Sequence, residues 1–106
     1  MATPFLCLST CPDAESAARI AHTLVEERLA ACANRVAGIA STYRWKGRIH
    51  EDTEVLLLIK TTRECFDALR ARLVELHPYE VPELVAIEVV DGHAAYLDWI
   101  AAATTR

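Results

Sequence analysis

The run Val55-Leu56-Leu57-Leu58-Ile59 decides the fold of this chain. Five consecutive apolar residues indicate a strand that is buried on both of its faces, because alternate side chains of a strand point to opposite sides. A sheet with one face in water would alternate apolar and polar residues instead. Helices that pack on such a sheet cover only one face, so something else has to cover the second.

This strand is the second arm of a predicted β-hairpin. Residues 35–45 and 48–60 have extended character, and Lys46-Gly47 between them is a turn signal. Arms of ten or more residues, at about 3.3 Å per residue, reach roughly 35 Å. A domain of this length has a radius of gyration of roughly 13 Å. We therefore expect the tip around Trp45 and Gly47 to overhang the core.

The rest of the chain supplies two further strands and three helices. A buried strand is predicted over residues 4–10, and Asp13 is a suitable N-cap for a helix that runs to about Cys32. Thr61-Thr-Arg-Glu64 fits a capping box for a second helix, which Pro78 ends. A strand over residues 84–90 and a short closing helix follow. One face of that last helix carries Tyr96, Trp99 and Ile100.

The order strand, helix, strand, strand, helix, strand is that of a ferredoxin-like α+β sandwich. We expect one domain over residues 1–106, with a long β-hairpin and a short C-terminal helix. Both main helices would cover one face of the sheet, so a further copy of the chain is the simplest cover for the other. Tyr43 and Trp45 on the overhanging hairpin are suitable anchors for such a neighbour.

Composition excludes several classes of function. The net charge is −4 and the pI is about 5.5, so a nucleic acid or an anionic membrane is a poor partner. The N-terminus lacks a basic region, and no apolar run approaches the ~20 residues of a membrane helix. We expect a cytoplasmic protein. Its four cysteines form no Cys-x-x-Cys pair, which argues against structural zinc.

The segment His77-Pro-Tyr-Glu-Val-Pro-Glu83 is the leading candidate site. Its two prolines restrict their own backbone and that of the residues before them, so the loop should be stiff. An imidazole and carboxylates together suit Cu(II), Zn(II) or Ni(II). The alternative is a structural joint, in which His77 ends a helix, Tyr79 fills an interface and Glu83 forms a salt bridge.

Other residues carry weaker signals. Cys11 lies just before a helix N-terminus, where the dipole can lower a thiol pKa, and the alternative is a buried turn residue. The polar cluster of residues 50–54 is interpreted as a solvated strand edge. With three glycines the chain cannot build a Gly-rich phosphate loop, and no nucleophile lies in a known motif. We expect no enzyme activity.

Six blocks together resemble the CutA divalent-cation tolerance family. They occur in the family's order and span nearly the whole chain: Thr10-Cys-Pro-Asp13, Leu24-Val-Glu-Glu-Arg-Leu-Ala-Ala-Cys32-Ala-Asn34, Tyr43-Arg-Trp45-Lys-Gly47, Leu58-Ile-Lys-Thr-Thr62, His77-Pro-Tyr-Glu-Val-Pro-Glu83 and Tyr96-Leu-Asp-Trp99. No single block is decisive, whereas the set is highly specific.

The resemblance implies a homotrimer whose sheets pack towards the three-fold centre, with the hairpin reaching across subunits. It also implies His77 and Glu83 as metal ligands. At the position where some members have a third, cysteine ligand this chain has Ser9. Cys11, two residues further on, is the candidate to replace that ligand if the turn brings its thiol round. The ion implied is Cu(II) or another divalent cation, with no organic cofactor.

Two main functions remain open at this point. The first is divalent-cation tolerance, copper above all, with metal bound at or near clefts between subunits. The second is a trimeric regulator that resembles PII signalling proteins and binds a small ligand in those clefts. A third is a stable scaffold for an unidentified partner protein. The cleft or interface residues predicted for the first two are Tyr79, Glu80, Tyr43, Trp45 and Trp99.

Overall fold

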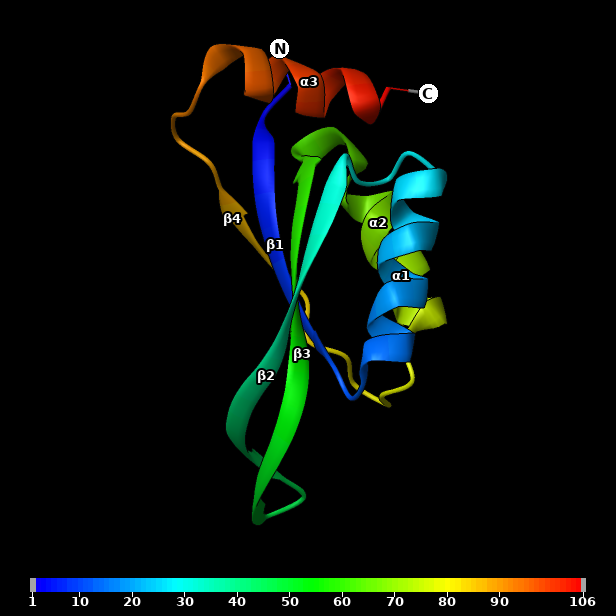
Figure 1. Cartoon of the computed structure of the whole chain (residues 1–106), viewed down its shortest axis with the longest axis vertical. Helices are drawn as coiled ribbons and strands as arrows, with labels where there is room; N and C mark the ends of the chain where they lie inside the picture. Colours follow the sequence, from blue (N-terminus) through cyan, green and yellow to red (C-terminus); the bar gives the residue numbers. More distant parts are fainter. Residues whose placement is uncertain (1, 106) are drawn as a thin grey trace.

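The computed structural model describes residues 2–105. Its elements are β1 (Pro4–Cys11), α1 (Ala14–Glu26), β2 (Cys32–Trp45), β3 (Arg48–Thr62), α2 (Arg63–Leu76), β4 (Val85–Glu88) and α3 (Ala94–Ala103). The strands form one antiparallel sheet in the order β2-β3-β1-β4 (Figure 1). The predicted α+β class and element order are confirmed.

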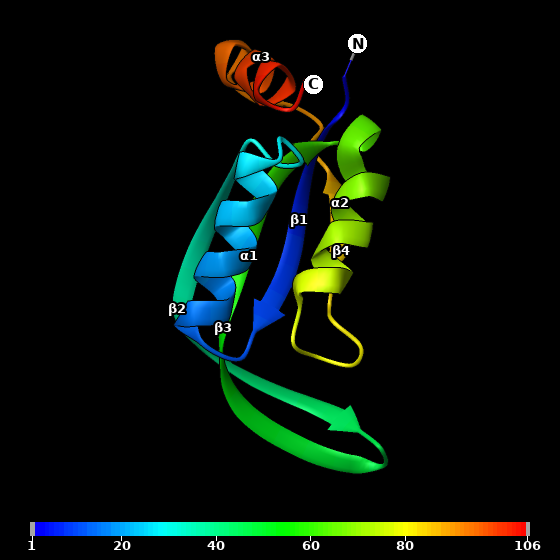
Figure 2. The ribbon, with the colours of Figure 1, turned by 90° about the vertical axis from the view of Figure 1, so that its right-hand side faces the viewer.

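Helices α1 and α2 lie side by side on one face of the sheet (Figure 2). Alternation along the strands decides which residues they bury: Cys7 and Ser9 of β1 pair with Ile59 and Leu57 of β3, and none of the four is exposed. We call this side the covered face. The core beneath the helices also includes Phe5, Cys11, Ala17, Ile20, Leu24, Leu69 and Leu73.

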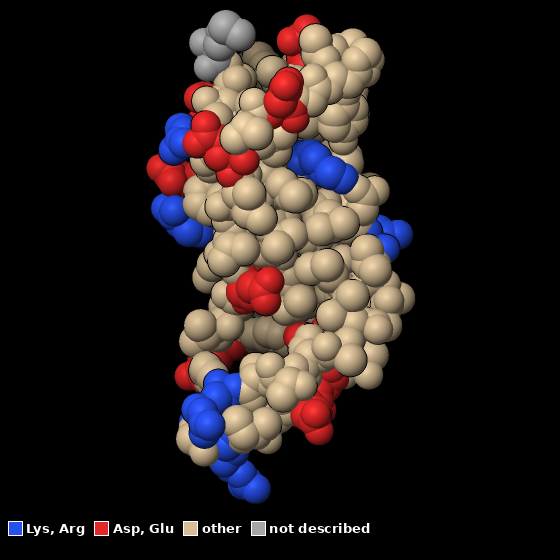
Figure 3. Space-filling model, turned by 90° about the vertical axis from the view of Figure 1, so that its left-hand side faces the viewer, with Lys and Arg blue, Asp and Glu red and all other residues tan. Residues whose placement is uncertain are grey.

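Within residues 2–105, no helix lies over the centre of the opposite side, which we call the open face (Figure 1). Leu56 and Leu58 point to this face and are only half-buried, whereas Leu57 between them belongs to the covered face. Most of the surface across its middle is uncharged (Figure 3). Its apolar residues are Leu6, Leu8, Val36, Leu56, Leu58, Val85 and Ile87.

Helix α1 begins as predicted but ends earlier. The Asp13 carboxylate accepts a hydrogen bond from the Ser16 backbone N–H at 2.8 Å, which confirms the N-cap. The predicted extension to Cys32 is wrong, because Arg28 adopts a left-handed conformation with φ 60°. The Leu29 N–H then donates to the Leu24 carbonyl at 2.9 Å, and the Arg28 N–H donates to the Val25 carbonyl at 3.1 Å.

This pair of bonds is a Schellman motif, in which the residue after the turn packs against the last helical turn. Leu29 and Leu24 are both buried. The apolar pattern that suggested more helix therefore continues into the core as a buried turn.

The predicted capping box of α2 is wrong. The N-cap is Thr62, and its side chain makes no capping hydrogen bond. Thr61 still belongs to β3, where its buried hydroxyl donates to the Leu29 carbonyl at 2.7 Å. Glu64 accepts from the Thr3 backbone N–H instead of closing the box. Thr61 thus fixes the turn after α1 to the sheet.

The hairpin of β2 and β3 bends away from the sheet at a β-bulge (Figure 2). Val36 pairs with Leu56 and Ile39 with Glu54, so two residues of β2 oppose one of β3. Gly38 has φ 76°, a conformation that an L side chain rarely adopts. Beyond the bulge lies the distal hairpin, residues 39–54. The predicted overhang is confirmed, since the molecule extends 44 × 25 × 22 Å.

The predicted turn at the hairpin tip is also confirmed. Lys46 and Gly47 both have positive φ, and Trp45 pairs with Arg48, as in a two-residue type I′ turn.

The C-terminal part is less buried than expected. Strand β4 spans Val85–Glu88, shorter than the predicted 84–90, and pairs with β1. On α3, Ile100 is buried, but Tyr96 and Trp99 are 41% and 45% exposed. Among the described residues, none of the helices is both long and apolar enough to cross a membrane.

Candidate functional site

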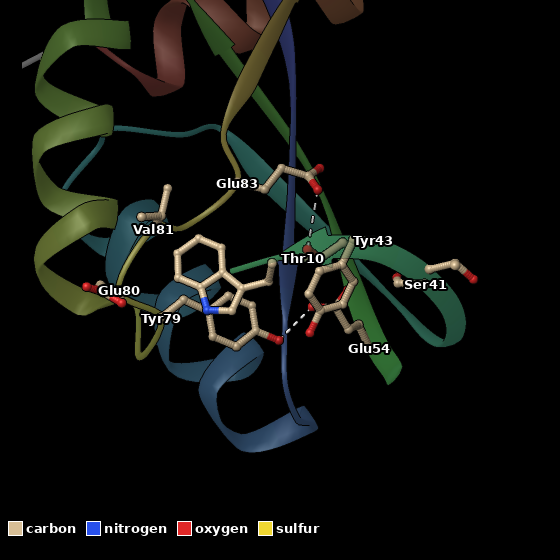
Figure 4. A pocket seen from close by; sticks show the side chains of 10 residues that line it. Thr10, Ser41, Tyr43, Glu54, Tyr79, Glu80, Val81 and Glu83 are labelled. Atoms are coloured by element: carbon tan, nitrogen blue, oxygen red, sulfur yellow. Dashed lines mark hydrogen bonds between the residues drawn. The ribbon is translucent and has the colours of Figure 1, made fainter. Parts of the chain in front are cut away.

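The candidate site is a cavity of about 540 Å³ between the distal hairpin and the loop after α2 (Figure 4). The bend at Gly38 is what brings these two segments to face one another. Four of the five predicted cleft residues line the cavity from the two sides, Tyr43 and Trp45 from the hairpin and Tyr79 and Glu80 from the loop. Thr10, Ser41, Thr42, Glu54, Val81 and Glu83 complete the lining.

The fifth predicted cleft residue, Trp99, lies elsewhere. It is on α3, at the end of the molecule opposite the distal hairpin (Figure 1). There its ring tilts against Tyr96, with ring centroids 5.5 Å apart. The Tyr96 hydroxyl lies 3.9 Å from the thiol of Cys32, which starts β2. In the single chain, Trp99 therefore belongs to a separate aromatic surface.

His77 is the C-cap of α2 and is 6% exposed. Its Nε2 lies 2.8 Å from the Thr10 carbonyl, and its Nδ1 accepts from the Tyr79 backbone N–H at 3.1 Å. Because a carbonyl only accepts, Nε2 carries the proton. Both ring nitrogens are engaged, and the imidazole fastens the start of the loop to β1. Metal ligation by His77 requires one of these bonds to break.

Cys11 ends β1 on the covered face, with its thiol fully buried and 3.8 Å from His77 Nε2. Burial and the nearby carboxylates of Glu54 and Asp13 raise its pKa to about 11. Of the two interpretations of Cys11, a thiol pKa lowered by the helix dipole is not supported, because desolvation and like charges act in the opposite direction. The alternative, a buried residue beside the turn, describes this cysteine.

The Glu83 carboxylate lies on the opposite face of β1 from the Cys11 thiol. Ser9 donates from its hydroxyl to the Glu83 carbonyl at 2.7 Å, and Thr10 donates to the Glu83 carboxylate at 3.4 Å. Thr10 and Cys11 are consecutive in a strand, so their side chains point to opposite faces. The structure thus gathers the three predicted ligands around one end of β1 without joining them into one set. Within the described residues, no three His, Cys, Asp or Glu side chains are arranged to hold a metal ion.

Glu54 is the site residue that the sequence analysis missed. It was interpreted as part of a solvated edge, yet it is 6% exposed. The Tyr79 hydroxyl donates to its Oε2 at 2.6 Å, as Figure 4 shows. Burial, followed by this bond, raises the pKa of Tyr79, because loss of the phenol proton would place a second anion beside the carboxylate.

The cavity walls carry carboxylates on both sides and meet the open face. Glu54 comes from β3, whereas Glu80 and Glu83 come from the loop. The exposed Lys46 at the hairpin tip lies 3.9 Å from Glu80, so a weak ion pair links the two sides at the rim. Thr10 both lines the cavity and points to the open face. This arrangement of carboxylates favours the binding of cations. The cavity lies at the border of the open face.

Comparisons with known proteins agree on one family. The family of CutA1 divalent ion tolerance proteins matches residues 5–103. The divalent-cation tolerance protein CutA of Thermus thermophilus is 54% identical over 93 residues, which are 88% of this chain and 90% of that protein. Human protein CutA is 47% identical over 91 residues, 86% of this chain and 51% of that protein, so this chain spans about half of its length.

Solved structures of the same family have the fold described above. The crystal structure of CutA from Xylella fastidiosa superposes with a TM-score of 0.94 at 46% identity. The match covers 96% of this chain and 98% of that one.

Proposed function

Because the chain belongs to the CutA1 divalent ion tolerance family, we propose that it acts in divalent-cation tolerance as a homotrimer with cation sites in the clefts between subunits. The observation that carries the proposal is that the acidic cavity and the apolar open face adjoin one another. The acidic cavity opens beside the open face, and Thr10 belongs to both. Covering the open face with a neighbouring copy therefore brings new side chains to the cavity rim.

Assembly rests on the apolar content of the open face. Its seven apolar residues come from all four strands. Removing such surface from water stabilises an oligomer by roughly 25 cal/mol per Å². Light scattering of the pure protein measures the assembly directly. We expect the mass of a trimer, and a single species at 11.7 kDa would overturn the proposal.

A metal site would need ligands beyond those that converge in the single chain. The single chain offers Glu83 and Glu80 at the rim, and His77 and Cys11 behind Thr10. Since no three of its described donors converge, a partner subunit completes the set or the His77 ring turns. Cu(II) is the first ion to examine, because imidazole and carboxylate donors suit it. Cytoplasmic location and the absence of catalysis stay predictions.

Calorimetric titration of the assembled protein with Cu(II), Zn(II) and Mg(II) tests cation binding. Removing the charge with Glu83→Gln should weaken Cu(II) binding by about tenfold or more, as loss of one charged ligand does. His77→Gln shows whether the imidazole takes part. The matched control is Asp67→Asn, a similar change at an 88%-exposed side chain on α2. Equal affinities for all four proteins would remove the loop from the proposal.

A second function, a trimeric regulator with a small organic ligand, is favoured by one observation. The cavity is larger than a metal ion requires and has three aromatic rings in its walls. Such a shape is typical of small-molecule pockets.

A further inference from the structure

The aromatic walls of the cavity are held in place by other rings. Tyr43 stacks on His50 with centroids 5.4 Å apart and ring planes 14° apart. Tyr79 tilts against the buried His77 with centroids 4.8 Å apart. Trp45 stands at the hairpin tip and is 37% exposed. The faces of aromatic rings attract cations, most strongly when the cation is partly desolvated.

The charge of the cavity has one sign. Glu54, Glu80 and Glu83 line it, and its lining includes no lysine or arginine. The pKa of Tyr43 is raised, first by its hydrogen bond to Asp52 and also by the charge of Glu54. A cavity in which carboxylates oppose loss of a proton repels phosphates and other anions, and it attracts cations.

Glu54 supplies an acceptor with spare capacity. Tyr79 donates to its Oε2. No fully buried side-chain oxygen or nitrogen of the described residues lacks a hydrogen-bond partner, so the second oxygen, to which no side chain donates, is accessible to a ligand. A carboxylate that is 94% buried gains much from a charged donor, because hydrogen bonds between ionised groups are the stronger class. The free oxygen belongs to a side chain that lines the cavity.

The same features argue against a bare metal ion inside the cavity. A divalent metal needs several donors that converge on one point, and the described carboxylates do not converge. Aromatic faces cannot replace such donors for a strongly hydrated ion. An organic cation differs, because its charges are spread along a chain and its apolar segments fit against rings.

We propose that this cavity binds a linear polyamine, with one ammonium group on Glu54, a second on Glu80 at the rim, and the methylene chain between Tyr43, Trp45 and Tyr79 (Figure 4). A volume of about 540 Å³ lies within the 300–1,000 Å³ of small-molecule sites. This inference goes beyond divalent-cation binding and does not rest on it. The two proposals share a rim carboxylate, but Glu54 is a ligand of the polyamine alone, so Glu54→Gln separates them.

Calorimetry of the assembled wild-type protein with spermidine tests the proposal, with 1,4-butanediol as an uncharged analogue and succinate as an anion. We expect spermidine alone to bind. Glu54→Gln should weaken it by about tenfold or more. The matched control is Glu26→Gln, which removes a 72%-exposed carboxylate from α1. The control should leave binding within about twofold at fixed ionic strength.

Two more variants keep the test decisive if Glu54→Gln unfolds. Trp45→Leu retains apolar surface at a partly exposed position and should weaken binding several-fold through loss of the ring. Lys46→Asn removes the cation that competes at Glu80 and should strengthen binding. The proposal is overturned if wild-type protein does not bind spermidine, if the control loses as much affinity as Glu54→Gln, or if Trp45→Leu changes nothing.

Discussion

Strands β1 and β3 contribute side chains to both the covered and the open face of the sheet, yet the two sets of side chains differ in burial. On the covered face, Cys7, Leu57 and Ile59 are fully buried under α1 and α2. On the open face, Leu6, Leu8, Leu56 and Leu58 remain partly accessible. Residue types do not distinguish the faces, since leucines occupy both. The difference teaches that β1 and β3 use one set of apolar residues to form the core and leave a second set available for the assembly that we propose.

The largest expected effect comes from placing a charge in the middle of the open face. Leu8 pairs with Leu58 on one side and with Val85 on the other. Leu8→Asp should dissociate the proposed trimer, because each subunit would bury an unpaired carboxylate at a cost of several kcal/mol. Light scattering should then report 11.7 kDa.

The matched control for assembly is Val74→Asp on α2, where the side chain is 52% exposed. It adds the same charge on the side of the molecule that the helices occupy and should leave the proposed trimer intact. A Leu8→Asp protein that stays trimeric would show that the open face is not the interface.

A pair of adjacent leucines sharpens the comparison. Leu57→Ala removes a fully buried side chain of the covered face and should lower the free energy of unfolding by about 3 kcal/mol. Leu56→Ala, one residue away, should lower it by only about 1 kcal/mol in a chain that cannot assemble. Urea unfolding of both variants in the Leu8→Asp background measures these differences without the contribution of the interface.

The opposite ranking would contradict our assignment of the faces. If the protein assembles as proposed, its stability depends on protein concentration, and Leu56→Ala should lower it further by weakening subunit association.

The smallest expected effect concerns the turn after α1, which contains Arg28. Arg28 holds φ 60°, a conformation that costs an L residue about 1 kcal/mol or more and that glycine adopts freely. Arg28→Gly should raise the free energy of unfolding by about 0.5 kcal/mol, since greater freedom of the unfolded chain offsets part of the gain. Arg28→Ala keeps the strained conformation and serves as the control. Equal urea midpoints for the two variants would contradict the explanation.

Local patterns predicted most of the fold. Asp13, Lys46-Gly47 and Pro78 each act within a few residues, and the structure bears out the helix start, the turn and the helix end that they predicted. The two errors at helix ends meet at one contact. Helix α1 ends at the left-handed Arg28, and the turn that follows is joined to Thr61, whose hydroxyl donates to the Leu29 carbonyl. Such a contact between distant residues has no local signal.

The candidate site was predicted only in part, because some of its contacts also join residues that are far apart in the sequence. The loop of residues 77–83 was found because its prolines and ionisable groups stand together in the sequence. The role of His77 as a fastening to Thr10 could not be found, since the partner is 67 positions away. Glu54 was missed because its burial depends on the bend at Gly38 and on Tyr79.

The sequence by itself determined the order of the elements, the two apolar faces of the sheet and the stiffness of the loop. These follow from periodicity, turn residues and backbone restriction, which act over a few residues. The tertiary structure alone decided which leucines lie under the helices, where the hairpin bends and which carboxylate becomes buried. Those outcomes depend on the packing of segments far apart in the chain, and no local pattern specifies it.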